Sequence, residues 1–366
     1  MLFPPEKAFL VGVEITTGQQ LSLDETLTEL ARLAETAKAA VVGQIRQKRE
    51  RPDPRFFIGS GKLVELKNAA LSADANLIIF DNSLSPAQER NLEEALGIKV
   101  IDRTELILDI FAQHAKSHEG KLQVELAQAN FQMTRLSGHG VLMSRLGGGI
   151  GTRGPGETKL ESDRRLIKQR IAELNREIEK IRSDRAVRRD KRKSSRLPLV
   201  TLVGYTNAGK STLLKTLTKA EVLVADKLFA TLDTTIRRLY LPNGNHILLT
   251  DTVGFIQKLP HQLVAAFRAT LEEVTEADLL LHVVDAANPY FEDQIAAVYT
   301  VLEELNAVTK PIITIFNKSD LLEKKFSRQL LKKYEPAVAL SALQFPSDGF
   351  SHLFQLIQQK LEGLRF

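Results

Sequence analysis

The stretch GYTNAGKS, residues 204–211, decides the fold of the C-terminal part of this chain. It matches the glycine-rich pattern GxxxxGK[ST], follows a largely apolar run at 197–203 and precedes a helical pattern at 212–217. In this strand–loop–helix setting the pattern binds phosphate, because the glycines let backbone N–H groups turn inward. Lys210 is expected to contact the β- and γ-phosphates, and Ser211 to offer its hydroxyl to Mg²⁺.

Three further motifs follow this phosphate loop in the order typical of a nucleotide hydrolase. They are DTVG at 251–254, NKSD at 317–320 and SAL at 341–343. Asp251 ends a strand pattern, so its carboxylate should hold Mg²⁺ through water, and the Gly254 N–H should meet the γ-phosphate. We therefore predict Lys210 and Gly254 as the catalytic groups.

A switch segment should lie between the phosphate loop and DTVG. The sequence FATLDTT at 229–235 offers three threonines there, Thr231, Thr234 and Thr235. A threonine hydroxyl is the oxygen ligand that Mg²⁺ accepts beside the γ-phosphate. Composition alone does not choose among the three.

The NKSD motif predicts which base is bound. Asp320 can accept two hydrogen bonds from the N1–H and 2-amino group of guanine, whereas adenine lacks this donor pair and would leave the carboxylate unpaired. Lys318 should lie over the base through its aliphatic stem, and Asn317 should tie this loop to the phosphate loop. The backbone N–H of Ala342 is expected to donate to the guanine carbonyl.

The residue after DTVG is Phe255, which cannot orient an attacking water as a glutamine would. The free protein is therefore expected to hydrolyse GTP slowly, with the missing group supplied from elsewhere in the chain or by a partner. His282 lies in the apolar run LLLHVVDA and is expected in the core, with a catalytic role as the alternative.

Size and composition indicate a globular protein of two or three domains. The chain has 366 residues, of which 43% are hydrophobic, and it carries a formal charge of +5. It has no cysteine, which excludes disulfides, thiolate nucleophiles and cysteine-ligated metals. Residues 1–15 lack the pattern of a signal peptide, and no stretch is long enough to span a membrane. We expect a cytoplasmic protein.

Residues 1–115 alternate apolar runs with helical patterns, which predicts a small N-terminal α/β domain with a largely parallel sheet. Strands are expected at 9–15, 41–45, 76–80 and 100–101, and helices at 23–38, 62–72 and 86–96. The sequence FIGSGK at 57–62 is too short for a second phosphate loop, so we interpret it as a turn before a helix.

Residues 116–186 contain two helices with heptad-like apolar seams. One seam runs from Leu122 to Leu136 and the other from Leu160 to Ile181, so an antiparallel hairpin would bury both. The connection at 137–158 contains eight glycines and is not expected to be helical. A long connection without structure of its own is typical of a functional loop, and disorder is the alternative.

Basic residues gather on the second helix and beyond it. Residues 159–196 hold fifteen Lys or Arg and seven Asp or Glu. The densest part is 185–196, and 187–196 is interpreted as a basic linker. A solvated charged segment would explain this excess, but beside a basic hairpin tip an RNA-phosphate surface is favoured. The predicted RNA contacts are Arg145, Arg153 and Lys159. Aromatic residues are sparse here, which favours the backbone of structured RNA over base stacking.

Residues 197–366 are predicted to form a nucleotide-binding α/β domain with a mostly parallel six-stranded sheet. Its strands are expected near 200–203, 237–241, 246–249, 279–284, 312–316 and 338–340, with a final helix at 350–361.

Taken together, the motifs resemble those of HflX-type GTPases, of the translation-factor class and close to the Obg branch. The resemblance spans essentially the whole chain and rests on GYTNAGKST, FATLD, DTVGF, NKSD and SAL. It rests even more on LQVELAQ at 122–128 and GGGIGTRGPGETKLESDRR at 147–165, which are far more specific.

The resemblance implies a GTPase that binds the large ribosomal subunit and dissociates stalled or idle ribosomes under stress. The loop at 137–158 would approach the peptidyl-transferase region, and the magnesium-binding threonine would be Thr231, beside Ser211 and Asp251. A hydrophobic residue after DTVG, here Phe255, is also a feature of the family. The expected nucleotide-binding residues are Gly204, Tyr205, Thr206, Asn207, Ala208, Gly209, Lys210, Ser211, Thr212, Phe229, Ala230, Thr231, Leu232, Asp233, Asp251, Thr252, Val253, Gly254, Asn317, Lys318, Ser319, Asp320, Ser341, Ala342 and Leu343.

The expected cofactor is Mg²⁺, with GTP or GDP as the ligand. The expected partners are the large ribosomal subunit and its RNA, bound by a monomer without DNA or a stable membrane anchor. A second hypothesis is a regulatory GTPase switch whose helical hairpin binds a protein and never RNA. The basic tip and linker favour the first.

Overall fold

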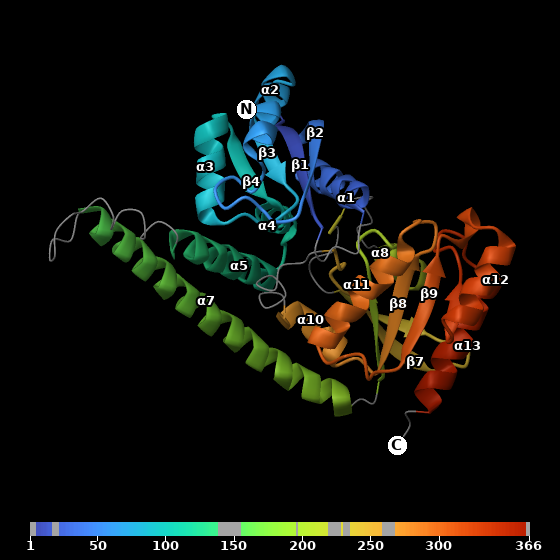
Figure 1. Cartoon of the computed structure of the whole chain (residues 1–366). Helices are drawn as coiled ribbons and strands as arrows, with labels where there is room; N and C mark the ends of the chain where they lie inside the picture. The colour runs from blue at the N-terminus through green and yellow to red at the C-terminus, as the bar shows by residue number, and fades with distance from the viewer. Residues whose placement is uncertain are drawn as a thin grey trace. The chain divides into compact units, whose positions relative to one another are not determined.

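The computed structural model describes residues 5–16, 22–137, 155–194, 197–218, 228–229, 235–257 and 268–363. The side chains of 155–160, 184–194, 268–270 and 324 are not among those described. The chain divides into two units (Figure 1). The first comprises Met1–Gln113 and Lys121–Ile178, and the second comprises His114–Gly120 and Glu179–Phe366.

The first unit contains a parallel four-stranded sheet, as predicted, and its strand order is β2-β1-β3-β4. Its strands are β1 (Lys7–Ile15), β2 (Ala40–Arg49), β3 (Leu77–Phe80) and β4 (Lys99–Asp102). Its first four helices are α1 (Leu23–Thr36), α2 (Ser60–Ser72), α3 (Pro86–Leu96) and α4 (Arg103–His114). Helix α4, which starts directly after β4, was not predicted from the sequence pattern.

Local capping explains where several of these helices begin. Ser85 and Gln88 form a capping box before α3, and Gly97 ends that helix in the left-handed conformation. Asp102 accepts the N–H of Glu105 at 3.0 Å, so the last residue of β4 caps the first turn of α4. At FIGSGK, Gly59 is the residue before α2, which confirms a turn leading into a helix.

The helices α5 (His118–Ser137) and α7 (Pro155–Ser194) run antiparallel, which confirms the predicted hairpin (Figure 1). Arg170 of α7 donates to Glu125 of α5 at 2.8 Å. Leu126 is buried and Leu174 is fully buried, whereas Ile167, Ile171, Ile178 and Ile181 of the α7 seam are half-buried.

Two predicted boundaries of the hairpin are wrong. Helix α7 starts at Pro155, inside the predicted connection at 137–158, because proline suits the first turn of a helix. It continues to Ser194, so most of the predicted linker at 187–196 is helical. Lys and Arg are good helix formers, and a charged run is therefore compatible with either state.

The second unit contains the predicted six-stranded sheet, in the order β10-β9-β8-β5-β7-β6. All neighbouring strands are parallel except β6 and β7. The strands are β5 (Leu199–Gly204), β6 (Thr235–Tyr240), β7 (His246–Asp251), β8 (Leu279–Asp285), β9 (Ile312–Asn317) and β10 (Ala337–Ala339). The helical elements are α8 (Lys210–Thr218), α10 (Arg268–Thr275), α11 (Phe291–Glu304), η1 (Ser319–Leu321), α12 (Lys324–Lys333) and α13 (Asp348–Glu362).

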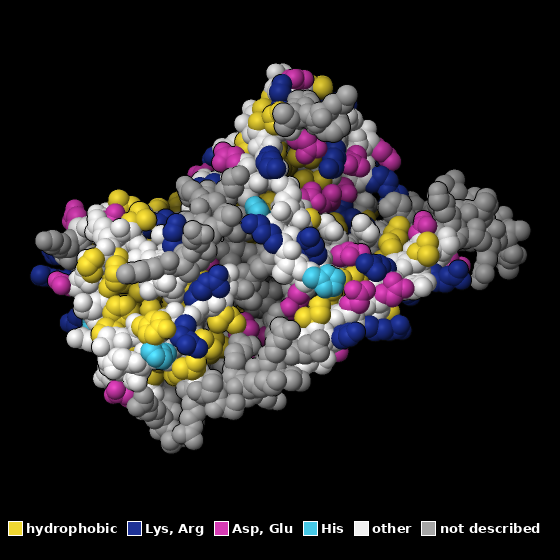
Figure 2. Space-filling view, turned by 180° about the vertical axis from the view of Figure 1, so that it is seen from behind, with side chains coloured by type: hydrophobic (Ala, Val, Ile, Leu, Met, Phe, Trp, Pro, Cys, Tyr) yellow, Lys and Arg dark blue, Asp and Glu magenta, His cyan; other side chains and the backbone are white. Residues whose placement is uncertain are grey.

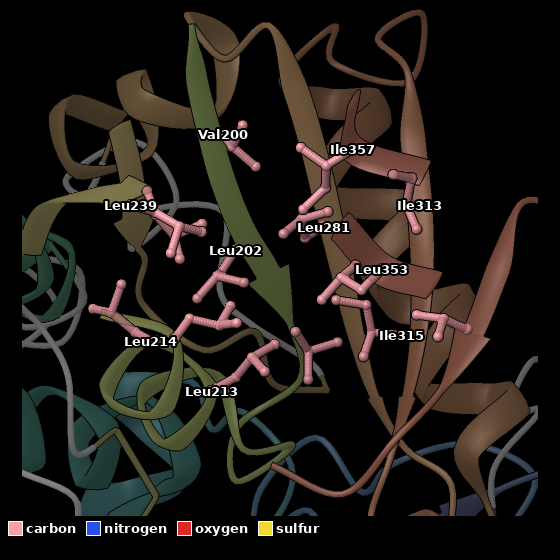
Figure 3. Packing of buried hydrophobic residues seen from close by; sticks show 14 of the residues in the cluster. Val200, Leu202, Leu213, Leu214, Leu239, Leu281, Ile313, Ile315, Leu353 and Ile357 are labelled. Carbon is pink, nitrogen blue, oxygen red and sulfur yellow. The ribbon is translucent and has the colours of Figure 1, made fainter. Parts of the chain in front are cut away.

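Helices cover both faces of this sheet. On one face, Leu214 of α8 and Leu353 of α13 pack with Leu202 and Leu281 in a fully buried cluster (Figure 3). On the other face, the Thr201 hydroxyl donates to a carbonyl of α10. Burying one such leucine stabilises the fold by roughly 1.5–3 kcal/mol. The packing therefore fixes the strand ends from which the sequence motifs leave.

No helix in the described ranges is long and apolar enough to cross a membrane.

Candidate functional site

The predicted motifs lie at one edge of the six-stranded sheet. The phosphate loop follows β5, DTVG begins at the last residue of β7, and NKSD begins at the last residue of β9. These three strands are parallel to their shared neighbours, so their carboxyl ends meet at the same edge. Ligands of open α/β sheets bind at this edge.

The phosphate loop needs glycine at both of its ends. Gly204 has φ +149°, and a Cβ there would lie 2.2 Å from the carbonyl oxygen of Val283. Gly209 has φ +95°, and a Cβ there would lie 2.1 Å from the Asn317 Nδ2. Both conformations and both close approaches exclude any other residue. The loop geometry expected from GxxxxGK[ST] is thus present.

Lys210 is buried inside this loop. Its Nζ donates to the carbonyl oxygens of Gly204 at 3.0 Å and Tyr205 at 2.7 Å. Burial lowers the pKa of Lys210 to about 8, and nearby Asp251 opposes this shift. The loop backbone therefore holds the ammonium where it can meet phosphate oxygens.

Ser211 and Asp251 are in direct contact. The Ser211 hydroxyl donates to Asp251 Oδ2 at 2.6 Å, and Asp251 is fully buried. A hydroxyl and a carboxylate are oxygen ligands of the kind that Mg²⁺ prefers, so these two residues fit the ion. In the part of the chain that the structure describes, no group of three or more His, Asp or Glu side chains could hold a metal.

The switch segment is only partly described. Phe229 is buried with φ +56°, and Thr235 begins β6, paired with Asp251 of β7. The predicted site residues Ala230, Thr231, Leu232 and Asp233 lie outside the described residues, as does Thr234.

The DTVG loop lies against the phosphate loop. A Cβ on Gly254 would lie 2.8 Å from Thr206 Cα and 3.1 Å from Lys210 Nζ. The Thr206 N–H donates to the Phe255 carbonyl at 2.7 Å, and the Phe255 N–H donates to the Gly204 carbonyl at 3.1 Å. The Phe255 side chain is 2% exposed, so it is part of the core. The neighbouring site residues Thr252 and Val253 are buried as well.

Asn317 joins the base-recognition loops to the phosphate loop, as the sequence analysis expected. Its Nδ2 donates to the Ala208 carbonyl at 2.8 Å, and its Oδ1 accepts the Ala342 N–H at 2.9 Å. The Ala342 N–H, expected at the guanine carbonyl, is therefore donated to Asn317 in this structure. Ser341 is buried and Leu343 is 83% exposed.

Lys318 has a partner that the sequence analysis missed. Its Nζ donates to Asp285 Oδ2 at 2.6 Å, and the other oxygen of Asp285 accepts the Ala287 N–H at 3.2 Å. Lys318 also has φ +59°, in the left-handed region. The only available signal was the aspartate that ends the apolar run LLLHVVD. Asp320 follows in η1 and is exposed, so its carboxylate is accessible to a base.

His282 is buried, with its ring 5.7 Å from that of Tyr299. Burial lowers its pKa to about 3, with Lys210 contributing to the shift, so the ring is neutral at neutral pH. The expectation of a core histidine is confirmed.

The predicted RNA contacts lie outside the described side chains. Arg145 and Arg153 are not described, and of Lys159 only its place in α7 is. Residues 161–183 hold seven Lys or Arg and five Asp or Glu, so most of the basic excess lies elsewhere. Figure 2 shows acidic and basic side chains interspersed on the face in view.

Three family models match consecutive parts of the chain. "GTP-binding GTPase N-terminal" matches residues 24–112, and "GTP-binding GTPase Middle Region" matches residues 114–192. "50S ribosome-binding GTPase" matches residues 199–318, which include the phosphate loop, DTVG and the first two residues of NKSD.

Curated relatives match most of the chain. A protein of Caldanaerobacter subterraneus subsp. tengcongensis named "GTPase HflX" is 53% identical over 318 residues, covering 87% of this chain and 73% of the relative. A protein of Escherichia coli K12 with the same name is 46% identical over 361 residues, covering 98% and 83%. Among solved structures, the complex of SsGBP with GDP has a TM-score of 0.51 at 26% identity and covers 98% of this chain and 100% of that one.

Proposed function

Since the chain belongs to the GTPase HflX family, we propose that its GTP hydrolysis drives binding to the large ribosomal subunit and the dissociation of stalled or idle ribosomes. That it binds and hydrolyses GTP follows from the family and from its phosphate-loop domain. The observation that carries the ribosomal proposal is the match of residues 199–318 to a 50S ribosome-binding GTPase. The antiparallel hairpin of α5 and α7 supports it.

In the proposed cycle, Ser211 and Asp251 would hold Mg²⁺, with Thr231 as a further ligand. The ion, when bound, would neutralise negative charge that develops on the phosphates. Lys210 would donate to the β- and γ-phosphate oxygens, and its burial strengthens that interaction because little water screens it. Gly254 offers its N–H to the γ-phosphate.

Guanine selection in this proposal rests on Asp320 and on the loops around it. Asp320 pairs with the N1–H and 2-amino group, and Lys318 covers the base. Asp285 accepts a hydrogen bond from the Lys318 ammonium at 2.6 Å, which fixes the end of the lysine side chain. Asn317 keeps the base loops in register with the phosphate loop.

Hydrolysis by the free protein is proposed to be slow. Phe255 occupies the position after DTVG, its side chain is buried, and its ring has no group that could hydrogen-bond to an attacking water. We propose that the bound ribosome supplies or positions the missing group, so hydrolysis accelerates on binding.

The hairpin is proposed to carry the ribosomal contact as part of a cytoplasmic monomer. The residues between α5 and α7 are rich in glycine, and glycines permit close backbone approach to RNA. Arg145, Arg153 and Lys159 would each pair with an RNA phosphate.

Co-sedimentation with purified large subunits tests the proposal, with a GTP analogue compared with GDP. The chain should pellet with subunits in the presence of the analogue, and light scattering should report ribosome splitting. Deletion of residues 147–156 should abolish splitting and leave GTP affinity unchanged. Binding to a protein partner instead of the subunit would favour the regulatory-switch hypothesis.

The double variant Arg145→Ala/Arg153→Ala sharpens this test. When the logarithm of its ribosome affinity is plotted against the logarithm of the salt concentration, the slope should be smaller than that of the wild type by about two, roughly one for each lost phosphate contact. Arg237→Ala/Arg238→Ala is the matched control, because both side chains are exposed on β6. If both double variants lost ribosome affinity equally, the effect would be general charge attraction, and a specific contact by residues 145 and 153 would be contradicted.

A further inference from the structure

We propose that Tyr205 is a positioning residue that holds the segment Gly254–Gln257 on the phosphate loop and thereby makes the site prefer GTP over GDP. The inference rests on the proposed contact between the Gly254 N–H and the γ-phosphate. It adds a residue whose role does not follow from the GxxxxGK[ST] pattern, which accepts any side chain at this position.

The backbone of the phosphate loop pairs with the segment after DTVG. The residues Tyr205 and Phe255 form a parallel bridge. It consists of the Thr206 N–H to the Phe255 carbonyl at 2.7 Å and the Phe255 N–H to the Gly204 carbonyl at 3.1 Å. The first residue after Gly254 is therefore tied on both sides to the loop that surrounds phosphate.

The Tyr205 side chain ties the same segment at a second point. Its hydroxyl accepts the Gln257 N–H at 2.8 Å. Tyr205 is 4% exposed, and Phe255, Ile256 and Gln257 are each 2% exposed, so water does not replace this hydrogen bond. The backbone of Gly204 and Thr206 thus holds position 255, and the side chain of Tyr205 between them holds position 257.

Gly254 has little freedom once the following residues are fixed. A Cβ at this position would lie 2.8 Å from both Cα and Cγ2 of Thr206, so the two backbones are in direct contact. It would also lie 3.1 Å from the Nζ of Lys210. A shift of residues 255–257 would therefore move the Gly254 N–H relative to the phosphates. GDP lacks the γ-phosphate and would not register such a shift.

A purely structural role for Tyr205 predicts a different result. If the hydroxyl only stabilised the core, its loss would leave the ratio of GTP to GDP affinity unchanged. The positioning role requires that ratio to fall while GDP affinity is retained. The two nucleotides therefore serve as each other's control.

The test is Tyr205→Phe, which removes one oxygen and keeps the ring in the core. Its GDP affinity should stay within about twofold of wild type. Affinity for a non-hydrolysable GTP analogue should fall about fivefold, the fold-change that one buried hydrogen bond is worth, and the hydrolysis rate should fall as well. Tyr334→Phe is the matched control, because its hydroxyl donates to Glu292 at an exposed site, and it should leave both nucleotides unaffected.

Amide hydrogen exchange provides a measurement that does not depend on a variant. In the wild-type protein, the GTP analogue should protect the Phe255 and Gln257 amides more than GDP does. Equal losses of both affinities in Tyr205→Phe, or no loss of either, would overturn the positioning role. Failure of the wild-type protein to bind GTP would instead refute the premise on which this inference rests.

Discussion

The side-chain amide of Asn317 is the most informative group to remove, because it makes two hydrogen bonds that join the base-recognition loops to the phosphate loop. The side chain is 2% exposed and joins two segments far apart in sequence, at Ala208 and Ala342. Those two residues are themselves 1% and 3% exposed, so water does not readily replace either bond. Asn317→Ala leaves one buried carbonyl and one buried N–H without this partner.

The free-energy loss expected for Asn317→Ala follows from these two hydrogen bonds. Leaving a buried polar group unsatisfied costs about 1–3 kcal/mol, so the loss of both bonds should cost roughly 2–6 kcal/mol, divided between folding stability and binding. Both bonds join groups of the protein itself, so much of the loss should be seen in the stability of the second unit. The rest of the free-energy loss comes from displacement of the two loops relative to each other, and it weakens nucleotide binding. A loss of about 1.4 kcal/mol in binding free energy corresponds to a tenfold rise in Kd. We expect GDP and GTP affinities to fall by the same factor of about ten or more.

Fluorescent nucleotide titration measures both affinities, and urea unfolding measures stability. Asn288→Ala is the matched control, because it removes a single exposed bond from Asn288 Oδ1 to the Tyr290 N–H and should change neither affinity. Binding of both nucleotides by Asn317→Ala within about twofold of wild type would refute the view that this amide holds the two loops together.

The remaining predictions concern three other positions. Asp320→Asn should weaken GTP binding and gain xanthosine triphosphate binding, because an amide can pair with the 2-oxo group; an unchanged preference in competition titrations would contradict the base assignment. With the pKa of Lys210 at about 8, phosphate binding requires its protonated form, so GTP affinity should be constant below pH 8 and fall above it by up to about tenfold per pH unit. Lys210→Arg stays protonated and should show no such fall in the same calorimetric series, which also controls for titration of the nucleotide. Leu174→Asp puts a charge at a fully buried position and should make the hairpin sensitive to limited proteolysis while GDP binding persists; a hairpin that stays resistant would count against the paired seams.

Apolar runs bounded by glycine or aspartate predicted the strands of the second sheet well. Buried parallel strands such as β5 and β8 are hydrophobic on both faces, so they stand out from the sequence. Strand β2 was predicted too short because Arg46 and Lys48 alternate with inward-facing residues at the edge of the first sheet. Helix α4 was missed because Asp102 ends a strand and caps a helix at once, leaving no turn between them.

The order of the motifs predicted where the nucleotide site lies. It does not show which side chains from different strands contact one another. The bridge made by Asn317 was expected because its role belongs to the NKSD pattern. The contacts of Asp285 with Lys318, 33 residues away, and of Tyr205 with Gln257, 52 residues away, depend on which strands are neighbours. No periodicity or spacing carries that information. Such contacts become visible only when β5, β7, β8 and β9 are placed in one sheet.

Two separate side-chain contacts position the phosphate loop, and they should affect nucleotide binding differently. Asn317 holds it at Ala208 on the base side, where GDP and GTP are alike, whereas Tyr205 joins it to the segment after DTVG, where only GTP has a phosphate. If the loop between them is rigid, the effects of Asn317→Ala and Tyr205→Phe on GTP affinity should add within about 0.5 kcal/mol. The fit at Gly209 argues for rigidity, because a Cβ there would lie 2.1 Å from the Asn317 amide and the backbone has no space to shift toward it. A larger coupling would mean that loss of one contact shifts the loop at the other, and that base recognition and γ-phosphate recognition are linked through it.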